Sequence, residues 1–172
     1  GKYVQKFENQ FSKFHGFKHS LATTSCTTAL HLILSALDIK NGDEVIAPSF
    51  TWVSTINSII YCGAKPILVD ITLDTLNASE EEILKKINKK TKAILVVNLF
   101  GYPFDVKKLR QKISNKIKII EDSACATGAR IRGKFTGHFS DASAYSFHPR
   151  KIITTGEGGM VTTNSTKLYK KM

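Results

Sequence analysis

Lys151 is the residue of this sequence best placed to do covalent chemistry. It lies in SFHPRKIITTGEGGMVTTN, residues 146–164, between an apolar strand and a glycine-rich turn. A lysine amine forms Schiff bases with aldehydes once it has lost its proton, and a rigid loop near cationic or apolar groups favours that loss. A solvated loop lysine is the default interpretation of any single lysine, so this one needs support from other stretches.

A pair of acids follows a buried strand in IIEDSACATG, residues 119–128. Glu121 and Asp122 directly follow a run of apolar residues. Burying a carboxylate in such surroundings costs free energy unless the carboxylate is paired or hydrogen-bonded. Such an acid is a candidate site residue. Capping of a following helix is an alternative. A metal ligand is a weaker alternative because no histidine is nearby, and we expect no metal site.

Two further stretches lie at expected strand ends. In TTSCTTAL, residues 23–30, the backbone N–H groups of Cys26, Thr27 and Thr28 would stay free at a helix start, where a phosphate binds well. An ordinary N-cap is the more economical interpretation of this stretch alone. Trp52, in SFTW, could stack on a planar ring or anchor the core, and the core is favoured in isolation.

Taken together, the four stretches supply the components of a pyridoxal phosphate site. They offer a phosphate-binding helix start, a ring-stacking aromatic, an acid for the pyridine nitrogen and a Schiff-base lysine. Each signal is weak alone, but all four follow strands, which is where α/β sheets bind ligands.

The elements that must position these residues alternate between helix and strand. Spacings of three to four among Tyr3, Phe7, Phe11 and Phe14 predict a first helix that stops at Gly16. Strands are predicted within 19–25, 43–50, 65–71, 91–100, 117–124, 142–148 and 158–164, and helices within 27–39, 53–63, 81–90 and 104–116. Residues 127–140 are predicted to be irregular. This order predicts a parallel, doubly wound sheet.

The composition favours a globular protein and argues against membrane-spanning, nucleic-acid-binding and disulfide-rich classes. The chain has 172 residues, of which 42% are hydrophobic, enough for one globular unit. No apolar run is long enough to cross a bilayer, and no signal-peptide core is present at the N-terminus. The formal charge of +11 comes almost entirely from dispersed lysines, which indicates solvated faces and no nucleic-acid partner. Three cysteines without a CxxC spacing indicate a reducing cytoplasm, without a disulfide framework or zinc site.

The four stretches, with DEVIAPSFTWVSTINSI at residues 43–59, closely resemble the DegT-type sugar aminotransferases along essentially the whole chain. The resemblance implies a fold-type-I, three-layer α/β/α sandwich with a mostly parallel seven-stranded sheet, and pyridoxal 5′-phosphate as the cofactor. It implies that Lys151 forms the Schiff base and that Asp122 pairs with the pyridinium nitrogen. Trp52 would stack on the ring. Cys26, Thr27 and Ser146 would hold the phosphate.

The same resemblance implies transfer of an amino group, from glutamate, to a keto sugar on a nucleotide carrier. Such reactions serve the synthesis of surface polysaccharide, lipopolysaccharide or glycosylated natural products. The family implies a cytoplasmic homodimer. Cys125 stands near the cofactor hydroxyl where the family usually has glutamine or histidine, and Cys26 stands where glycine is common. Tyr102 is a candidate sugar contact, with packing an equal alternative.

The last expectations concern how much of the family's length the chain covers and which functions compete with the aminotransferase. Residues 1–172 correspond to a partial cofactor-binding large domain, without the small C-terminal domain of the family. One rival is a sugar dehydratase of the same family, which carries histidine at the lysine position. A second is a non-catalytic family member, and a third, from another class, is a basic nucleic-acid-binding α/β domain. Lys151 argues against the dehydratase, and the presence of both Lys151 and Asp122 argues against a non-catalytic member. A nucleic-acid-binding domain would need clustered arginine and aromatic residues, which the sequence lacks.

Overall fold

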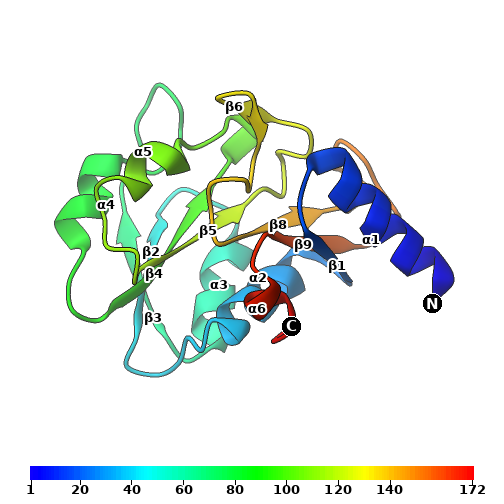
Figure 1. Cartoon of the computed structure of the whole chain (residues 1–172). Helices are drawn as coiled ribbons and strands as arrows, with labels where there is room; N and C mark the ends of the chain where they lie inside the picture. The colour runs from blue at the N-terminus through cyan, green and yellow to red at the C-terminus, as the bar shows by residue number, and fades with distance from the viewer.

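A seven-stranded sheet forms the middle layer of the molecule, and the computed structural model describes all 172 residues (Figure 1). The strand order is β1-β9-β8-β5-β4-β2-β3. Only β9 runs antiparallel to its neighbours, β1 and β8. The strands span His19–Thr23 (β1), Glu44–Pro48 (β2), Lys65–Val69 (β3), Thr91–Val97 (β4), Lys118–Asp122 (β5), Ala142–Ser146 (β8) and Gly159–Thr163 (β9). The predicted α/β class with a mostly parallel seven-stranded sheet is confirmed.

Helices cover both faces of the sheet, with one cluster of buried apolar residues on one face and two on the other. Helices α2 (Cys26–Ala36), α3 (Val53–Tyr61) and α6 (Thr166–Tyr169) pack on one face, in the largest cluster of buried apolar residues. Helices α4 (Glu80–Lys86) and α5 (Val106–Arg110) share a second cluster with the opposite face. On that same face, α1 (Lys2–His15) contributes Phe11 to a third cluster with Tyr145 and Met160. Successive strand residues point to opposite faces, so each central strand feeds both cores.

The helix ends follow from local chemistry. Gly16 closes α1 with φ of 74°, a left-handed conformation that glycine adopts without a steric penalty. The Ser25 side chain accepts the N–H of Thr28 and begins α2, while the Thr28 hydroxyl accepts the N–H of Ser25. Ser79 begins α4 by accepting the N–H of Glu82.

Several predicted boundaries were wrong. Helix α4 ends at Lys86 because Ile87 is extended, and α5 is a short helix ending at Arg110. A hairpin of β6 (Arg130–Ile131) and β7 (Lys134–Phe135) forms within the segment expected to be irregular. The 3₁₀ turn η1 (Leu99–Gly101) follows β4. In α1 the predicted apolar face is only partly used, since Tyr3 and Phe14 are 76% and 68% exposed.

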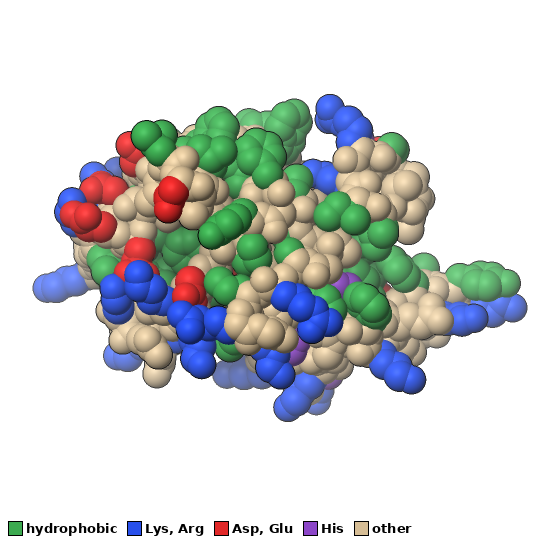
Figure 2. All heavy atoms as spheres, turned by 90° about the horizontal axis from the view of Figure 1, so that it is seen from above, with side chains coloured by type: hydrophobic (Ala, Val, Ile, Leu, Met, Phe, Trp, Pro, Cys, Tyr) green, Lys and Arg blue, Asp and Glu red, His purple; other side chains and the backbone are tan.

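The surface carries the dispersed charge of the sequence. Figure 2 shows lysine and arginine side chains projecting around the outline of this face, most of them along its lower edge, while acidic side chains gather on the left. Every helix of the structure is too short or too polar to span a bilayer.

Candidate active site

A cavity of about 610 Å³ opens where the parallel strands end. It is lined by the starts of α2 and α3, the ends of β4, β5 and β8, and the loop between β8 and β9. Its volume falls in the range of pockets that bind small molecules and cofactors. Seven of the sequence-predicted site residues line it: Cys26, Thr27, Trp52, Asp122, Cys125, Ser146 and Lys151.

Asp122 is the buried acid of the cavity. It is the last residue of β5, its side chain is 5% exposed, and it faces the α2 and α3 side of the sheet. Its Oδ2 accepts the Thr55 hydroxyl at 2.8 Å, and its Oδ1 accepts the Ala124 N–H at 3.1 Å. Burial raises the pKa of the Asp122 carboxyl, while the Thr55 and Ala124 hydrogen bonds and the charge of Lys151 oppose that rise.

Lys151 reaches the same cavity from the loop between β8 and β9. Its backbone N–H donates to the carbonyl of His148 at 2.9 Å, in a tight turn that follows directly on β8. Its Nζ donates to Sγ of Cys125 at 3.3 Å. The amine and the Asp122 carboxylate therefore line one hollow, although 29 positions separate them in the chain (residues 122 and 151).

The start of α2 leaves two backbone donors without a partner. The N–H groups of Cys26 and Thr27 make no hydrogen bond within the protein, as the geometry of a helix start requires. The Thr28 N–H is not free, contrary to the expectation from the sequence, because Ser25 caps it at 3.1 Å. The start of α2 is thus an ordinary N-cap that leaves two N–H donors free, which is what an anion requires.

Glycine at position 159 lets β9 approach this helix start. A Cβ there would lie 2.4 Å from the Ser25 carbonyl and 2.7 Å from the Cys26 nitrogen, far inside van der Waals contact. Burial and the Asp122 charge raise the pKa of the Cys26 thiol well above its ordinary value. The Cys26 side chain therefore stays a neutral thiol, 3.8 Å from Asp122 Oδ1.

Aromatic side chains stand at the cavity mouth. Trp52 is the N-cap of α3 and is 68% exposed, so its favoured interpretation as a core anchor was wrong. Phe100 lines the cavity with φ of 52°, a strained conformation for a non-glycine residue. Tyr102 is not among the lining residues, and its carbonyl accepts the Asn77 side chain at 3.0 Å.

Sequence reasoning missed several residues that line the cavity. His148 and Glu157 lie on either side of Lys151 in the chain, with Nε2 and Oε1 3.8 Å apart. The Thr55 hydroxyl, which holds Asp122, was also missed. Its position in VSTINS, residues 53–58, gives no local signal, because the contact spans 67 residues.

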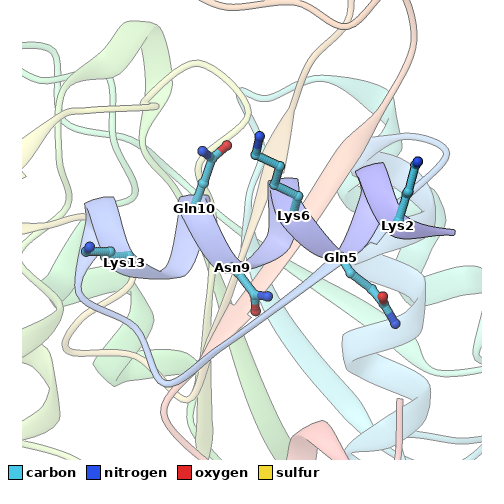
Figure 3. Close-up of a pocket in the computed structure, with 6 residues that line it drawn as sticks. All are labelled: Lys2, Gln5, Lys6, Asn9, Gln10 and Lys13. Atoms are coloured by element: carbon cyan, nitrogen blue, oxygen red, sulfur yellow. The ribbon is translucent and has the colours of Figure 1, made fainter.

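A second hollow, of about 400 Å³, runs along the outer surface of α1. Figure 3 shows that its six lining side chains all come from that helix. They are lysines and amides, with no acid and no apolar group to hold a ring: Lys2, Gln5, Lys6, Asn9, Gln10 and Lys13. The strand-end cavity is therefore the candidate active site.

Comparison with known proteins identifies the family. Residues 1–172 match the profile of the DegT/DnrJ/EryC1/StrS aminotransferase family. The chain belongs to this family. Its members depend on pyridoxal phosphate, and a putative sugar aminotransferase from Streptococcus pneumoniae has been solved in a PLP form, with a TM-score of 0.94 and 31% identity to this chain. That match covers 99% of this chain and 49% of the other.

Two more relatives of this DegT-family chain are closer in sequence. A GDP-perosamine synthase from Vibrio cholerae is 44% identical over 172 residues, covering 99% of this chain and 47% of the relative. The aminotransferase structure from Psychrobacter cryohalolentis superposes with a TM-score of 0.95 at 39% identity, over 99% of this chain and 44% of that one. The chain thus spans just under half the length of the relatives it matches.

The cavity fits the cofactor of the family on structural grounds. It presents a primary amine, a buried carboxylate, an exposed indole and two unpartnered N–H donors within one hollow. These are the groups that an aldehyde, a pyridine nitrogen, a planar ring and a phosphate each require.

Proposed function

We propose that this protein is a pyridoxal phosphate-dependent aminotransferase that moves an amino group from an amino-acid donor, glutamate, to a keto sugar on a nucleotide carrier. The single observation that carries the proposal is the shared cavity of Lys151 and Asp122. A relative that is 44% identical is named for a GDP-linked sugar, so GDP-linked keto sugars are the first substrates to test.

Each residue has a distinct role in this proposal. Lys151 holds the cofactor through its Nζ and, when released, carries a proton to and from the substrate carbon. Asp122 keeps a proton on the ring nitrogen. The N–H groups of Cys26 and Thr27, with the Ser146 hydroxyl, bind the phosphate. Trp52 stacks on the ring and excludes water from one side of it.

When bound, pyridoxal phosphate supplies an aldehyde that condenses with amines and a ring that accepts electrons from the adjacent carbon. The surroundings in this chain favour that chemistry. Asp122 is buried and hydrogen-bonded, so the interaction of its carboxylate with a cation on the ring would be little screened by water. Cys125 places its sulfur against the Lys151 amine, and a thiol is a weaker hydrogen-bonding partner than an amide or imidazole.

We also propose that the enzyme acts as a cytoplasmic homodimer. Large apolar side chains stand exposed at the cavity mouth and along the adjoining face of α3, including Trp52, Val53, Ile60 and Tyr61, each at least half exposed. A second copy would cover them. Three free cysteines suit a reducing compartment. Light scattering on the complete gene product should give twice the protomer mass, and a monomer that is fully active would contradict the dimer.

The test of the proposed activity is a substrate panel. The complete gene product, loaded with pyridoxal phosphate, is incubated with glutamate and a series of 3-keto and 4-keto sugars linked to GDP, UDP and TDP. We expect 2-oxoglutarate release with at least one member of the series. Lys151→Ala should abolish the visible absorption of the bound cofactor and lower turnover by at least about a hundredfold.

Lys89→Ala is the matched control, because Lys89 is an exposed lysine just before the start of β4, whereas the cavity lies where the parallel strands end. It should leave both the absorption and the turnover unchanged. Full activity in Lys151→Ala would refute the assignment.

A further inference from the structure

The Thr55 hydroxyl is the one side chain that satisfies Oδ2 of Asp122. It comes from α3, is completely buried, and lies 2.8 Å from that oxygen. The other carboxylate oxygen, Oδ1, has two partners, the Ala124 N–H at 3.1 Å and the Cys26 thiol at 3.8 Å. Thr55 thus fixes one oxygen of the carboxylate, while Ala124 and Cys26 hold the other.

The hydroxyl is itself held in a fixed donor direction. An ionised carboxylate only accepts hydrogen bonds, so Thr55 must donate its single hydroxyl proton to Asp122. The Thr51 hydroxyl lies 2.8 Å from the Thr55 oxygen, and it must then be the donor of that pair. Thr51 lines the cavity, so this chain of hydroxyls begins at the mouth and ends at the buried acid. Hydrogen bonds in such a chain polarise and strengthen one another.

The hydrogen-bond partners of Asp122 suit a carboxylate better than a neutral acid. A buried acid could be stabilised equally well in its neutral form, which needs only one acceptor for its proton and avoids the cost of a buried charge. The polar neighbours of Asp122 favour its charged form: the Thr55 hydroxyl, the Ala124 N–H, the Cys26 thiol and the charge of Lys151 all oppose the rise in pKa that burial causes. These contacts fix the direction of the carboxylate and offset part of the cost of burying its charge.

We infer that Thr55, supported by Thr51, is a positioning residue that fixes the Asp122 carboxylate for its contact with the ring nitrogen of pyridoxal phosphate. The inference rests on the proposed function. Thr55 itself does not touch the cofactor in this account. It acts through Asp122, so its loss should weaken cofactor binding without removing any group that contacts the cofactor.

The test is a titration of the cofactor-free complete protein with pyridoxal phosphate, followed by the absorption of the bound cofactor. Thr55→Val keeps the shape of the side chain and removes the hydroxyl. Hydrogen bonds to charged groups are stronger than neutral ones, so we expect the dissociation constant to rise by about tenfold to a hundredfold. Thr55→Ser restores the hydroxyl and should stay within about threefold of the wild type.

Thr162→Val is the matched control. Thr162 is equally buried, on β9, and its hydroxyl has no hydrogen-bond partner. The same substitution there should leave cofactor affinity unchanged. Urea unfolding of all variants separates a change in folding from a change in binding.

Unchanged affinity in Thr55→Val would overturn the inference, as would equal losses in the valine and serine variants. If Thr55→Val does not fold, Thr51→Val decides, since it keeps the Thr55 bond and removes only its supporting donor. Thr51→Val should raise the dissociation constant about threefold, and an unaltered value would overturn the inference. The proposed function is judged separately, because Lys151→Ala destroys activity whatever the role of Thr55.

Discussion

Asp122 carries the electrostatic part of the proposed chemistry. Its carboxylate is buried and surrounded by donors, and its burial raises its pKa even in their presence. A buried carboxyl whose pKa is shifted from its ordinary value and that lines a cavity is typical of a functional site. The acid was recognised in the sequence because two carboxylates end an apolar strand. The other acid, Glu121, is buried outside the cavity lining, where it accepts the Asn98 side chain and the Gly137 N–H, each at 2.9 Å.

Asp122→Asn removes the charge of the side chain and keeps its shape, so it tests the charge alone. The amide keeps an oxygen to accept the Thr55 hydroxyl but cannot hold a proton on a ring nitrogen. We expect turnover with glutamate to fall by about a hundredfold or more, as for other losses of a preorganised charge. Thermal stability without cofactor should be equal or higher, because a desolvated charge is removed. Turnover within threefold of the wild type would show that Asp122 does not perform this role.

Single residues also show where sequence reasoning ends. Trp52 has the size and apolarity of a core residue, and only its place at the start of α3 leaves it exposed at the cavity mouth. Thr55 is one threonine among many, and its contact with Asp122 depends on how α3 packs against β5. Residue type predicts what a side chain can do, whereas three-dimensional packing decides what it meets.

At the scale of elements, strands and caps were predictable and short elements were not. The central strands are continuous apolar runs, as expected when both faces are covered, and Ser25, Ser79 and Gly16 mark helix ends by local hydrogen bonding and φ. The β6–β7 hairpin has only two residues in each strand, too few for a periodic signal. The end of α4 lies at an extended Ile87, and α5 stops at Arg110, positions that no glycine or proline in the sequence marks.

Helix α1 contains a buried histidine that should make folding sensitive to acid. His15 stacks on Phe11 with ring centroids 4.1 Å apart, its Nδ1 lies 3.1 Å from the Phe11 carbonyl, and its Nε2 has no partner. Burial lowers the pKa of His15 below its ordinary 6.5, with nearby His138 and Arg130 acting in the same direction. The unfolded chain then binds a proton more readily than the folded one.

Stability should therefore fall as the pH drops below about 6.5. From this one group the free energy of unfolding should decrease by up to about 1.4 kcal/mol per pH unit, until the lower pKa of the folded state is passed. Urea unfolding at pH 7.5 and 5.5 measures the difference. His15→Phe keeps a ring in the aromatic stack and should lose most of that difference, and an unchanged difference in the variant would exclude His15 as its source.

At the scale of the whole molecule, chain topology assembles the site. The helix start at Cys26, the acid at Asp122 and the amine at Lys151 meet because β1, β5 and β8 all end at one edge of the sheet, as ligand sites in open α/β sheets do. That convergence was predictable from alternating strands and helices. The shape of the cavity mouth was harder to predict from the sequence, because it depends on loops such as η1 and on a strained backbone at Phe100.

The most direct test of the central claim is to find the lysine to which the cofactor attaches. The complete protein is loaded with pyridoxal phosphate, reduced with borohydride, digested and analysed by mass spectrometry. The proposed function predicts that the phosphopyridoxyl group is found on Lys151 alone and is absent from a Lys151→Arg variant treated in the same way. A label on another lysine, or a protein that binds the cofactor without any label, would contradict it.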